Sequence, residues 1–194
     1  FCNGTESCNA GTGCQPGTPP CTGSQQCDEA IDRCRSPLMS CQLAAAVADA
    51  GTNVTLNLFL DDVRNVRGYQ TQIAITRTSG TGTVSVNCPG GVSIDQGRPD
   101  YVFSGLGTTF PATNCSLRRA ASALLSGSAT VNSPKYLSTY TLTVSNDATA
   151  GSTFDVSIMT TPASALTDAS NQAIPFSVSA PCTLTVGSSK NATV

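Results

Sequence analysis

Cysteine is the residue type whose number and spacing point most directly to chemistry in this chain. The 194 residues include ten cysteines and no histidine. A zinc site of mixed Cys/His type would need imidazole ligands, and the early cysteines lack the C-x-x-C pairs that zinc-thiolate sites favour. We therefore expect disulfides, which persist outside the reducing cytosol. Six of the cysteines follow one another with five or six residues between neighbours: Cys2, Cys8, Cys14, Cys21, Cys27 and Cys34.

These six cysteines are expected to pair among themselves, in a connectivity that the sequence leaves open. The other four are then Cys41, Cys88, Cys115 and Cys182. Because four cysteines remain, they can form two bridges. We expect a Cys41–Cys182 bridge that joins the two ends of the later part of the chain, with Cys88–Cys115 as the second pair. Closing a loop of roughly 140 residues would stabilise the fold by close to 5 kcal/mol in the chain-entropy model. A bond between Cys41 and Cys34 is the alternative.

No arrangement of residues in the sequence predicts catalysis. Hydrolases of the Ser-His-Asp or Cys-His kind need an imidazole, and the chain has none. A Ser-Lys pair would have to use Lys135, beside a proline, or Lys190, in a polar stretch at the end of the chain. Asp61 and Asp62 are adjacent, and neighbours on a strand point to opposite faces, so they do not form a glycosidase pair. We expect a protein that is not an enzyme and has no catalytic residue.

We also expect no cofactor. The oxygen ligands that calcium prefers could come from the Asp61-Asp62 pair together with Asp95, Asp100 or Asp168, but no EF-hand spacing supports such a site. The glycine-rich stretches SGTGT and SGLGT carry no lysine and open no evident helix, so a phosphate-binding loop is not expected. Calcium stays the one alternative.

The elements that must position these residues change in character near residue 40. Residues 1–40 contain few large aliphatic side chains, so disulfides rather than burial must hold that stretch together. Residues 41–187 read as short strands, with apolar side chains alternating with Thr and Ser, as in NVTLNLFL at 53–60. AAAVA at 44–48 and IPFSV at 174–178 are included among the expected strands. The sequence therefore predicts an all-β protein, an antiparallel sandwich preceded by a small disulfide-rich, loop-dominated module and followed by a polar tail at 188–194.

Three segments of the expected sandwich resemble the cohesin-like β-sandwich family, which occurs in bacterial cellulosome scaffolds and in other secreted or cell-surface proteins. They are GTNVTLNLFLDDVRNVRGYQTQIAIT, LSTYTLTVSNDATAGSTFDVSI and LTDASNQAIPFSVSAPCTLTV. The stretch FCNGTESC also resembles a small Cys-rich module of bacterial surface proteins. The resemblance implies a cohesin-like fold, used either to dock a partner module or as a structural building block.

The composition restricts the partners. With 11% charged residues and a net charge of −2, the chain has no basic stripe for nucleic acid, and no apolar run is long enough to span a membrane. We expect an extracellular or cell-surface protein. The favoured function is a non-catalytic structural or adhesive subunit that assembles into a surface layer or filament, binding copies of itself or another extracellular protein. The alternative is a recognition module for a docking domain or a carbohydrate.

Two groups of residues could mark the surface of such a protein. Sugar binding would need exposed aromatic rings. The candidates for those rings are Phe59, Tyr101, Phe103, Phe110 and Tyr136. Sequons for N-glycosylation occur at Asn3, Asn53, Asn114 and Asn191.

Overall fold

The computed structural model describes residues 4, 7–9, 13–15, 17, 18, 21–23, 25–107, 109–160 and 162–188, and residues 7–9 and 13–15 by their backbone alone. In this part of the chain every regular element is a β-strand, as the sequence predicts. Cys2, Asn3, Asn191 and most of the expected tail fall outside the described residues, as do the side chains of Cys8 and Cys14.

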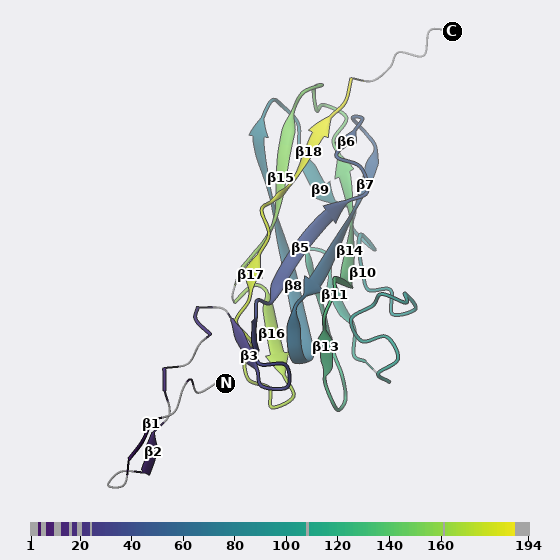
Figure 1. Cartoon of the computed structure of the whole chain (residues 1–194). Coiled ribbons are helices and arrows are strands. Elements are labelled where there is room, and N and C mark those ends of the chain that lie inside the picture. The colour runs from purple at the N-terminus through teal and green to yellow at the C-terminus, as the bar shows by residue number, and fades with distance from the viewer. Residues whose placement is uncertain are drawn as a thin grey trace.

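Two sheets pack face to face to form a sandwich (Figure 1). The six-stranded sheet has the order β10-β14-β7-β5-β17, and β9 pairs with β14 as well. Its strands are β5 (Leu38–Leu43), β7 (Asn53–Asp61), β9 (Val84–Val86), β10 (Val92–Ser93), β14 (Lys135–Val144) and β17 (Ser177–Val178). Most pairs are antiparallel, and the short edge pair β17–β5 is parallel.

The eight-stranded sheet has the order β11-β12-β8-β15-β18-β6, and β13 and β16 pair with the first half of β8. Its strands are β6 (Val47–Ala48), β8 (Val63–Ser79), β11 (Ala112–Asn114), β12 (Arg119–Ala123), β13 (Ala129–Val131), β15 (Thr153–Ile158), β16 (Ala165–Asp168) and β18 (Cys182–Val186). β8 therefore runs the length of this sheet, with different partners along its two halves. The β18–β6 pair is parallel.

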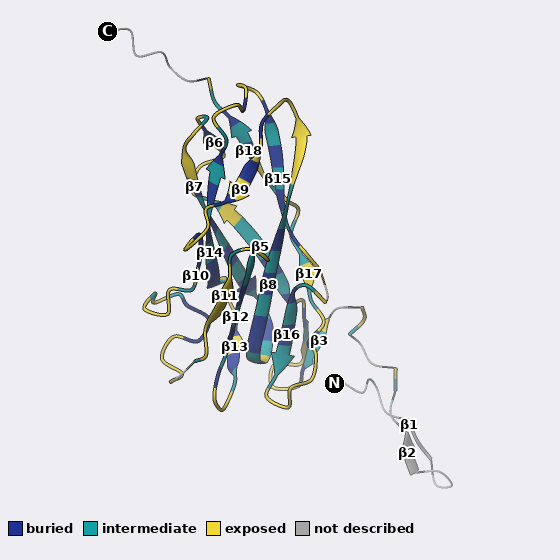
Figure 2. Ribbon diagram, turned by 180° about the vertical axis from the view of Figure 1, so that it is seen from behind, coloured by how far each residue is buried: buried dark blue, intermediate teal, exposed yellow. Residues whose placement is uncertain are grey.

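The alternation of apolar and polar residues places one face of each sheet in a shared core (Figure 2). Leu56, Leu58 and Leu60 of β7 are fully buried, while the residues between them are only partly covered. This is the two-residue period that a strand with one covered face requires. Phe154 and Val156 of β15 face them from the other sheet, so burial of aliphatic side chains from both layers stabilises the sandwich.

Two expected strands are shorter than the sequence predicts. In the 44–48 run only Val47 and Ala48 are strand residues, and the three alanines before them form a bend. In the 174–178 run only Ser177–Val178 forms a strand, because Pro175 has no N–H to donate to a neighbouring strand. The first strand of the sandwich, in contrast, begins at Leu38 and buries Met39 completely, so the sheet takes in residues from before position 41.

Two small hairpins precede the sandwich: β1 (Ser7–Asn9) with β2 (Gly13–Gln15), and β3 (Gln26–Asp28) with β4 (Arg33–Arg35). The second hairpin contacts the end of the sandwich where β8 begins (Figure 1). The side chain of Gln26 donates to the carbonyl of Arg64 at 2.7 Å and accepts from its N–H at 2.6 Å. Cys21 is bonded to Cys34 across a Cα–Cα distance of 5.4 Å, and Cys27 is disulfide-bonded too.

Both disulfides of the sandwich join one sheet to the other. Cys41 of β5 is bonded to Cys182 of β18, with 6.1 Å between their Cα atoms. Cys88, just after β9, is bonded to Cys115, just after β11. These are the two pairs that counting the cysteines favoured, and the first closes a loop of 141 residues.

Tyrosine hydroxyls inside the core are hydrogen-bonded across the two sheets. The Tyr69 hydroxyl donates to the Leu137 carbonyl at 2.6 Å, and the Tyr140 hydroxyl lies 3.0 Å from the Thr71 hydroxyl. Burial raises the pKa of Tyr140 to about 12 and raises that of Tyr69 further. Each phenol is thus paired as the neutral form, which burial favours.

These two tyrosines predict alkaline unfolding. Above pH 10 the phenols of the unfolded chain ionise, whereas those of the folded chain stay neutral, so stability that is complete below pH 10 is lost as the pH rises toward the folded pKa of about 12. We expect the phenolate absorbance of Tyr69 and Tyr140 to appear together with loss of the circular dichroism signal. In Tyr140→Phe the loss of stability with rising pH should be shallower. Ionisation of all four tyrosines before unfolding would contradict the prediction.

Candidate functional site

The carboxylates that might have bound calcium are engaged within the fold. Asp62 pairs with Arg33 and accepts the Ser36 N–H at 2.7 Å. Asp100 pairs with Arg98 at 2.7 Å, and this hydrogen bond lowers the pKa of the Asp100 carboxyl below its usual value. Asp95 and Asp168 accept backbone N–H groups in tight turns. Across the described residues, no three acidic, cysteine or histidine side chains come together in a way that would hold a metal ion.

The five candidate rings do not form an exposed aromatic surface for a carbohydrate. Tyr101, Phe103 and Tyr136 are buried in the core, each 2% exposed or less. Phe59 is partly buried and packs edge-on against Tyr136, with 6.4 Å between the ring centroids. Only Phe110, at 60% exposure, keeps its ring in solvent. The prediction was wrong for three of the five rings because they fill the space between the sheets, where large side chains contribute most to burial.

The outer side of the eight-stranded sheet carries a shallow surface built mostly from small side chains. Registers across β8 bring Ala121 and Ala165 to either side of Gln70, and Ala123 and Thr167 to either side of Gly68. A Cβ atom on Gly68 would lie 2.8 Å from the Thr167 hydroxyl, so glycine lets the neighbouring strands meet there. We call this surface the β8 face. Its residues are Gly68, Gln70, Gln72, Arg119, Ala121, Ala123, Ala165 and Thr167.

Hydrogen bonds hold the longer side chains of the β8 face in place. The Gln70 side chain donates to the Ala163 carbonyl at 2.9 Å. The Arg119 guanidinium donates to the side-chain oxygen of Gln72 at 2.9 Å, and these two residues are cross-strand neighbours. Side chains that are already fixed lose less conformational entropy when a partner covers them. The longer side chains of the face are therefore already ordered.

Exposed apolar side chains surround the β8 face. Seven large apolar side chains are exposed in the described part of the chain, and four of them lie here. Phe110 lines a shallow hollow of about 320 Å³ together with Gln70 and Ala121. Leu117 and Met159 line a second hollow of about 370 Å³ beside Gln72. Leu125 continues the outward series of β12. A shallow centre of small residues with an apolar rim is a surface that a protein partner could cover.

The centre of the β8 face has little charge, although Arg118 lines the hollow beside Gln72 and Arg67 donates to the Leu125 carbonyl at the rim. Among the outward side chains of β8 between Gln70 and Thr76, and of the neighbouring β12, β15 and β16 as far as Thr167, the charged ones are Arg119 and Asp155. Asp155 accepts a hydrogen bond of 2.7 Å from the Thr183 hydroxyl. Because so few ions would have to be desolvated at the centre of the face, covering that part costs little electrostatic free energy.

Both described sequons are exposed. Asn53 lies in β7 of the other sheet, whereas Asn114 is the cross-strand neighbour of Arg119 at the border of the β8 face. The Asn53 side-chain oxygen accepts from the Thr143 hydroxyl at 2.7 Å, and that of Asn114 accepts from the Leu117 N–H at 2.9 Å. Asn114 also precedes the bridged Cys115. Glycosylation at these two positions stays a prediction.

Comparison with known proteins was made by sequence and by structure. No family model matches the chain, and no curated protein matches it. A cohesin of R. flavefaciens, the third of ScaB, solved in complex with a group 1 dockerin, superposes with a TM-score of 0.58 at 14% identity. The match covers 79% of this chain and 96% of that cohesin. The protein has a cohesin-like fold.

Further cohesins superpose less closely on the cohesin-like fold of this chain. The third cohesin ScaC of Acetivibrio cellulolyticus, in complex with the ScaB dockerin, has a TM-score of 0.49 at 11% identity, and covers 77% of this chain and 99% of its own. A Clostridium thermocellum complex of Coh-OlpC with Doc435 gives 0.47 at 9% identity, with 79% and 94% covered. At these identities the likeness concerns the fold alone.

Sequence reasoning missed the β8 face for a physical reason. In RAASA, residues 119–123, the inward and outward positions are all Ala or Ser apart from Arg119, so hydrophobicity does not alternate. The available signal was the pair of outward glutamines in GYQTQIAIT, at 70 and 72, on a strand whose inward residues are Tyr69, Thr71 and Ile73.

Proposed function

We propose that this protein is a non-catalytic recognition module that binds a domain of another extracellular protein through the β8 face. The observation that carries the proposal is the β8 face itself, a shallow surface of small and hydrogen-bonded side chains with little charge at its centre and four exposed apolar side chains around it. The cohesin-like fold supports it, since the most similar cohesin described above was solved with a dockerin bound. The partner class we propose is a dockerin-type domain.

An extracellular location is consistent with the covalent structure. The described bridges Cys21–Cys34, Cys41–Cys182 and Cys88–Cys115 belong to a class of bond that persists in oxidising compartments. Among the described residues, no helix has the length and apolar character needed to cross a bilayer. A module that meets its partner outside the cell fits both observations.

The test is surface plasmon resonance with the protein immobilised and a panel of dockerin domains as analytes. We expect saturable binding of at least one dockerin, with a Kd below about 1 μM for an interface of standard size. Ala121→Arg places a long charged side chain in the centre of the β8 face and should weaken binding at least a hundredfold. Thr141→Arg is the matched control, because Thr141 faces outward on β14, in the opposite sheet.

Self-assembly, the function that the sequence favoured, is a second candidate. The low charge of the β8 face favours it, because two copies would meet there with little repulsion. Sedimentation velocity separates the two candidates. Association of the protein with itself that Ala121→Arg abolishes would make a second copy the partner. A strict monomer that binds none of the dockerins would refute the proposed function.

A further inference from the structure

Among the described residues, the second half of β8 has a neighbouring strand on only one side. From Ile73 to Ser79, β15 pairs with one edge of β8. On the other edge, the β12 ladder ends where Arg119 pairs with Gln72, and the last backbone bond is from the Ile73 N–H to the Arg118 carbonyl at 3.2 Å. In Figure 1 this tip of β8 is the outermost ribbon at the upper left of the sandwich. The sheet therefore ends in an open edge of strand length.

The backbone groups that face this edge can be assigned from the ladder. Met159 donates to the Gln72 carbonyl on the β15 side, whereas Ile73 donates on the opposite side. Since successive residues of a strand direct their N–H and C=O groups to alternate edges, those of Ile75 and Arg77 point toward the open edge. No hydrogen bond to these groups is found from any residue that the structure describes. They can pair with a further strand.

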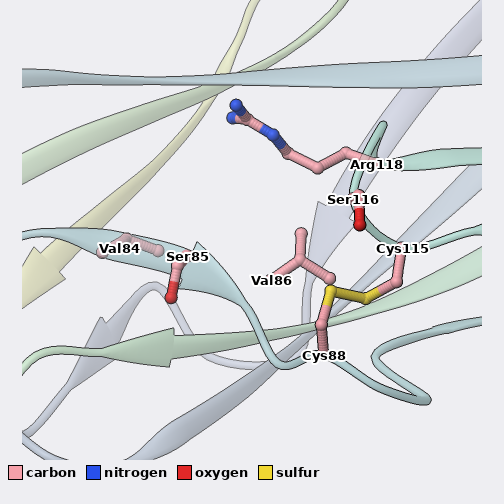
Figure 3. Close-up of a pocket in the computed structure, with 7 residues that line it drawn as sticks. All are labelled: Val84, Ser85, Val86, Cys88, Cys115, Ser116 and Arg118. Atoms are coloured by element: carbon pink, nitrogen blue, oxygen red, sulfur yellow. A yellow bond between two sulfur atoms is a disulfide. The ribbon is translucent and has the colours of Figure 1, made fainter.

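Two hollows lie between this edge and β9 of the other sheet. One, of about 320 Å³, is lined by Ile75, Val84 and Phe154. The other, of about 250 Å³, is lined by Val84, Val86 and the Cys88–Cys115 disulfide, and Figure 3 shows these groups with Arg118 on its far side. Val84 lines both, so the hollows are neighbours. We call the gap between the open edge of β8 and β9, with its two hollows, the seam. Along the seam, apolar side chains of the interior are accessible beside an unpaired strand.

The charges at the seam have one sign. Arg77 lines the first hollow and Arg118 the second. Arg77 donates to the Gly82 carbonyl at 3.0 Å, which leaves its positive charge uncompensated. Among the described residues no carboxylate lines either hollow or pairs with Arg118. An occupant of the seam must therefore bring its own negative charge.

We propose that the open edge of β8 binds an extended acidic segment of a partner protein, which adds to the sheet as one more strand. Running antiparallel to β8, the segment forms main-chain hydrogen bonds with Ile75 and Arg77. Two aliphatic side chains, opposite Arg77 and Ile75, face inward and fill the hollows. The segment then leaves the sheet, because Arg118 already occupies the edge beside Ile73, and an acidic side chain meets the Arg118 guanidinium there. A second copy of this chain fits less well, because edge-to-edge pairing would bring both copies' Arg77 and Arg118 together.

The probe is a fluorescent peptide with the sequence Thr-Val-Thr-Val-Thr-Glu-Thr, blocked at both ends. We expect its fluorescence anisotropy to rise saturably on addition of the whole protein. In the proposed register the N–H of the second valine points to Ile75, and that of the threonine after it points to solvent. N-methylation of the valine should weaken binding at least tenfold, and N-methylation of the threonine less than threefold.

A charge exchange tests the role of Arg118. Arg118→Glu should weaken binding of the peptide more than tenfold, and the peptide with Lys in place of Glu should recover affinity for that variant. Lys135→Glu, the same charge change at the start of β14, should bind the original peptide normally.

No saturable binding, or equal binding of the two methylated peptides, would overturn the proposal. So would a dimer of the free protein that the peptide dissociates, since the occupant would then be a second copy. The proposal does not depend on the β8 face.

Discussion

Replacing both Cys41 and Cys182 with alanine lowers the free energy of unfolding by about 5 kcal/mol at most, and this is among the largest effects we expect from any change that leaves the core intact. The bond ties β5 of one sheet to β18 of the other and closes a loop of 141 residues. In its absence the unfolded chain gains the conformational freedom that the loop denied it. Urea unfolding of the oxidised variant, compared with the parent protein, measures the loss.

The Cys88–Cys115 bridge provides the matched control. It also joins the two sheets, but its loop has only 27 residues, for which the same entropy model predicts about 3.5 kcal/mol. We therefore expect the double alanine variant at Cys88 and Cys115 to be the more stable of the two by roughly 1 to 1.5 kcal/mol. Equal losses, or a larger loss from the shorter loop, would show that local packing around the sulfurs outweighs chain entropy.

The strands that the sequence predicted well are those with aliphatic residues at every inward position. In β7 the series Val54, Leu56, Leu58, Leu60 is buried throughout, and hydrophobicity alone locates the strand and its covered face. The same holds for Phe154 and Val156 in β15. Such patterns need no tertiary information, because each side chain by itself prefers the interior.

The features that the sequence did not reveal depend on contacts between distant residues. β12 has small residues on both faces, so only its neighbours in the sheet decide which side is outward. Tyr101 and Tyr136 could equally have been surface rings, and only the space between the sheets assigns them to the core. The open edge of β8 follows from where β12 ends, a matter of register that periodicity does not encode.

The disulfide-rich module was the part of the structure that the sequence predicted least. Its cysteines predicted crosslinks, but its link to the sandwich rests on charged side chains that, in sequence, look like ordinary surface residues. Arg35, 3% exposed, donates to the Asp28 carboxylate at 2.6 Å and to the Asn132 side chain at 2.9 Å. Arg64 of β8 reaches the same carboxylate at 3.0 Å. The β3–β4 hairpin is thus fastened to β8 and to the segment after β13.

The second large effect is expected from Arg35→Met, which keeps the length of the side chain but removes its charge and its donors. Asp28, Asp62 and Asn132 then lose a buried partner, although Asp28 keeps its pair with Arg64. Breaking a buried ion pair on one side is costly, so we expect the free energy of unfolding to fall by up to about 3 kcal/mol. We expect a matching fall in the urea midpoint, together with faster proteolysis within residues 21–36. Arg33→Met is the control. Arg33 pairs with Asp62 at the surface, where its side chain is 49% exposed, and such a pair contributes less than about 1 kcal/mol.

Two further observations separate a buried-charge effect from a simple loss of packing. Adding Asp28→Leu to Arg35→Met removes the carboxylate that has lost its buried partner and should recover part of the lost stability, because replacing both members of a buried ion pair with apolar residues is often tolerated. Recovery is only partial because Arg64, which is partly exposed, loses its contact with Asp28. The second observation is the pH dependence of the free energy of unfolding. The hydrogen bond from Arg35 lowers the pKa of the Asp28 carboxyl, so its contribution is complete above the pKa of the unfolded chain and is lost as the pH falls through the folded value. The parent protein should therefore lose stability in acid more steeply than the double variant, and equal slopes would show that Arg35 holds the hairpin by packing alone.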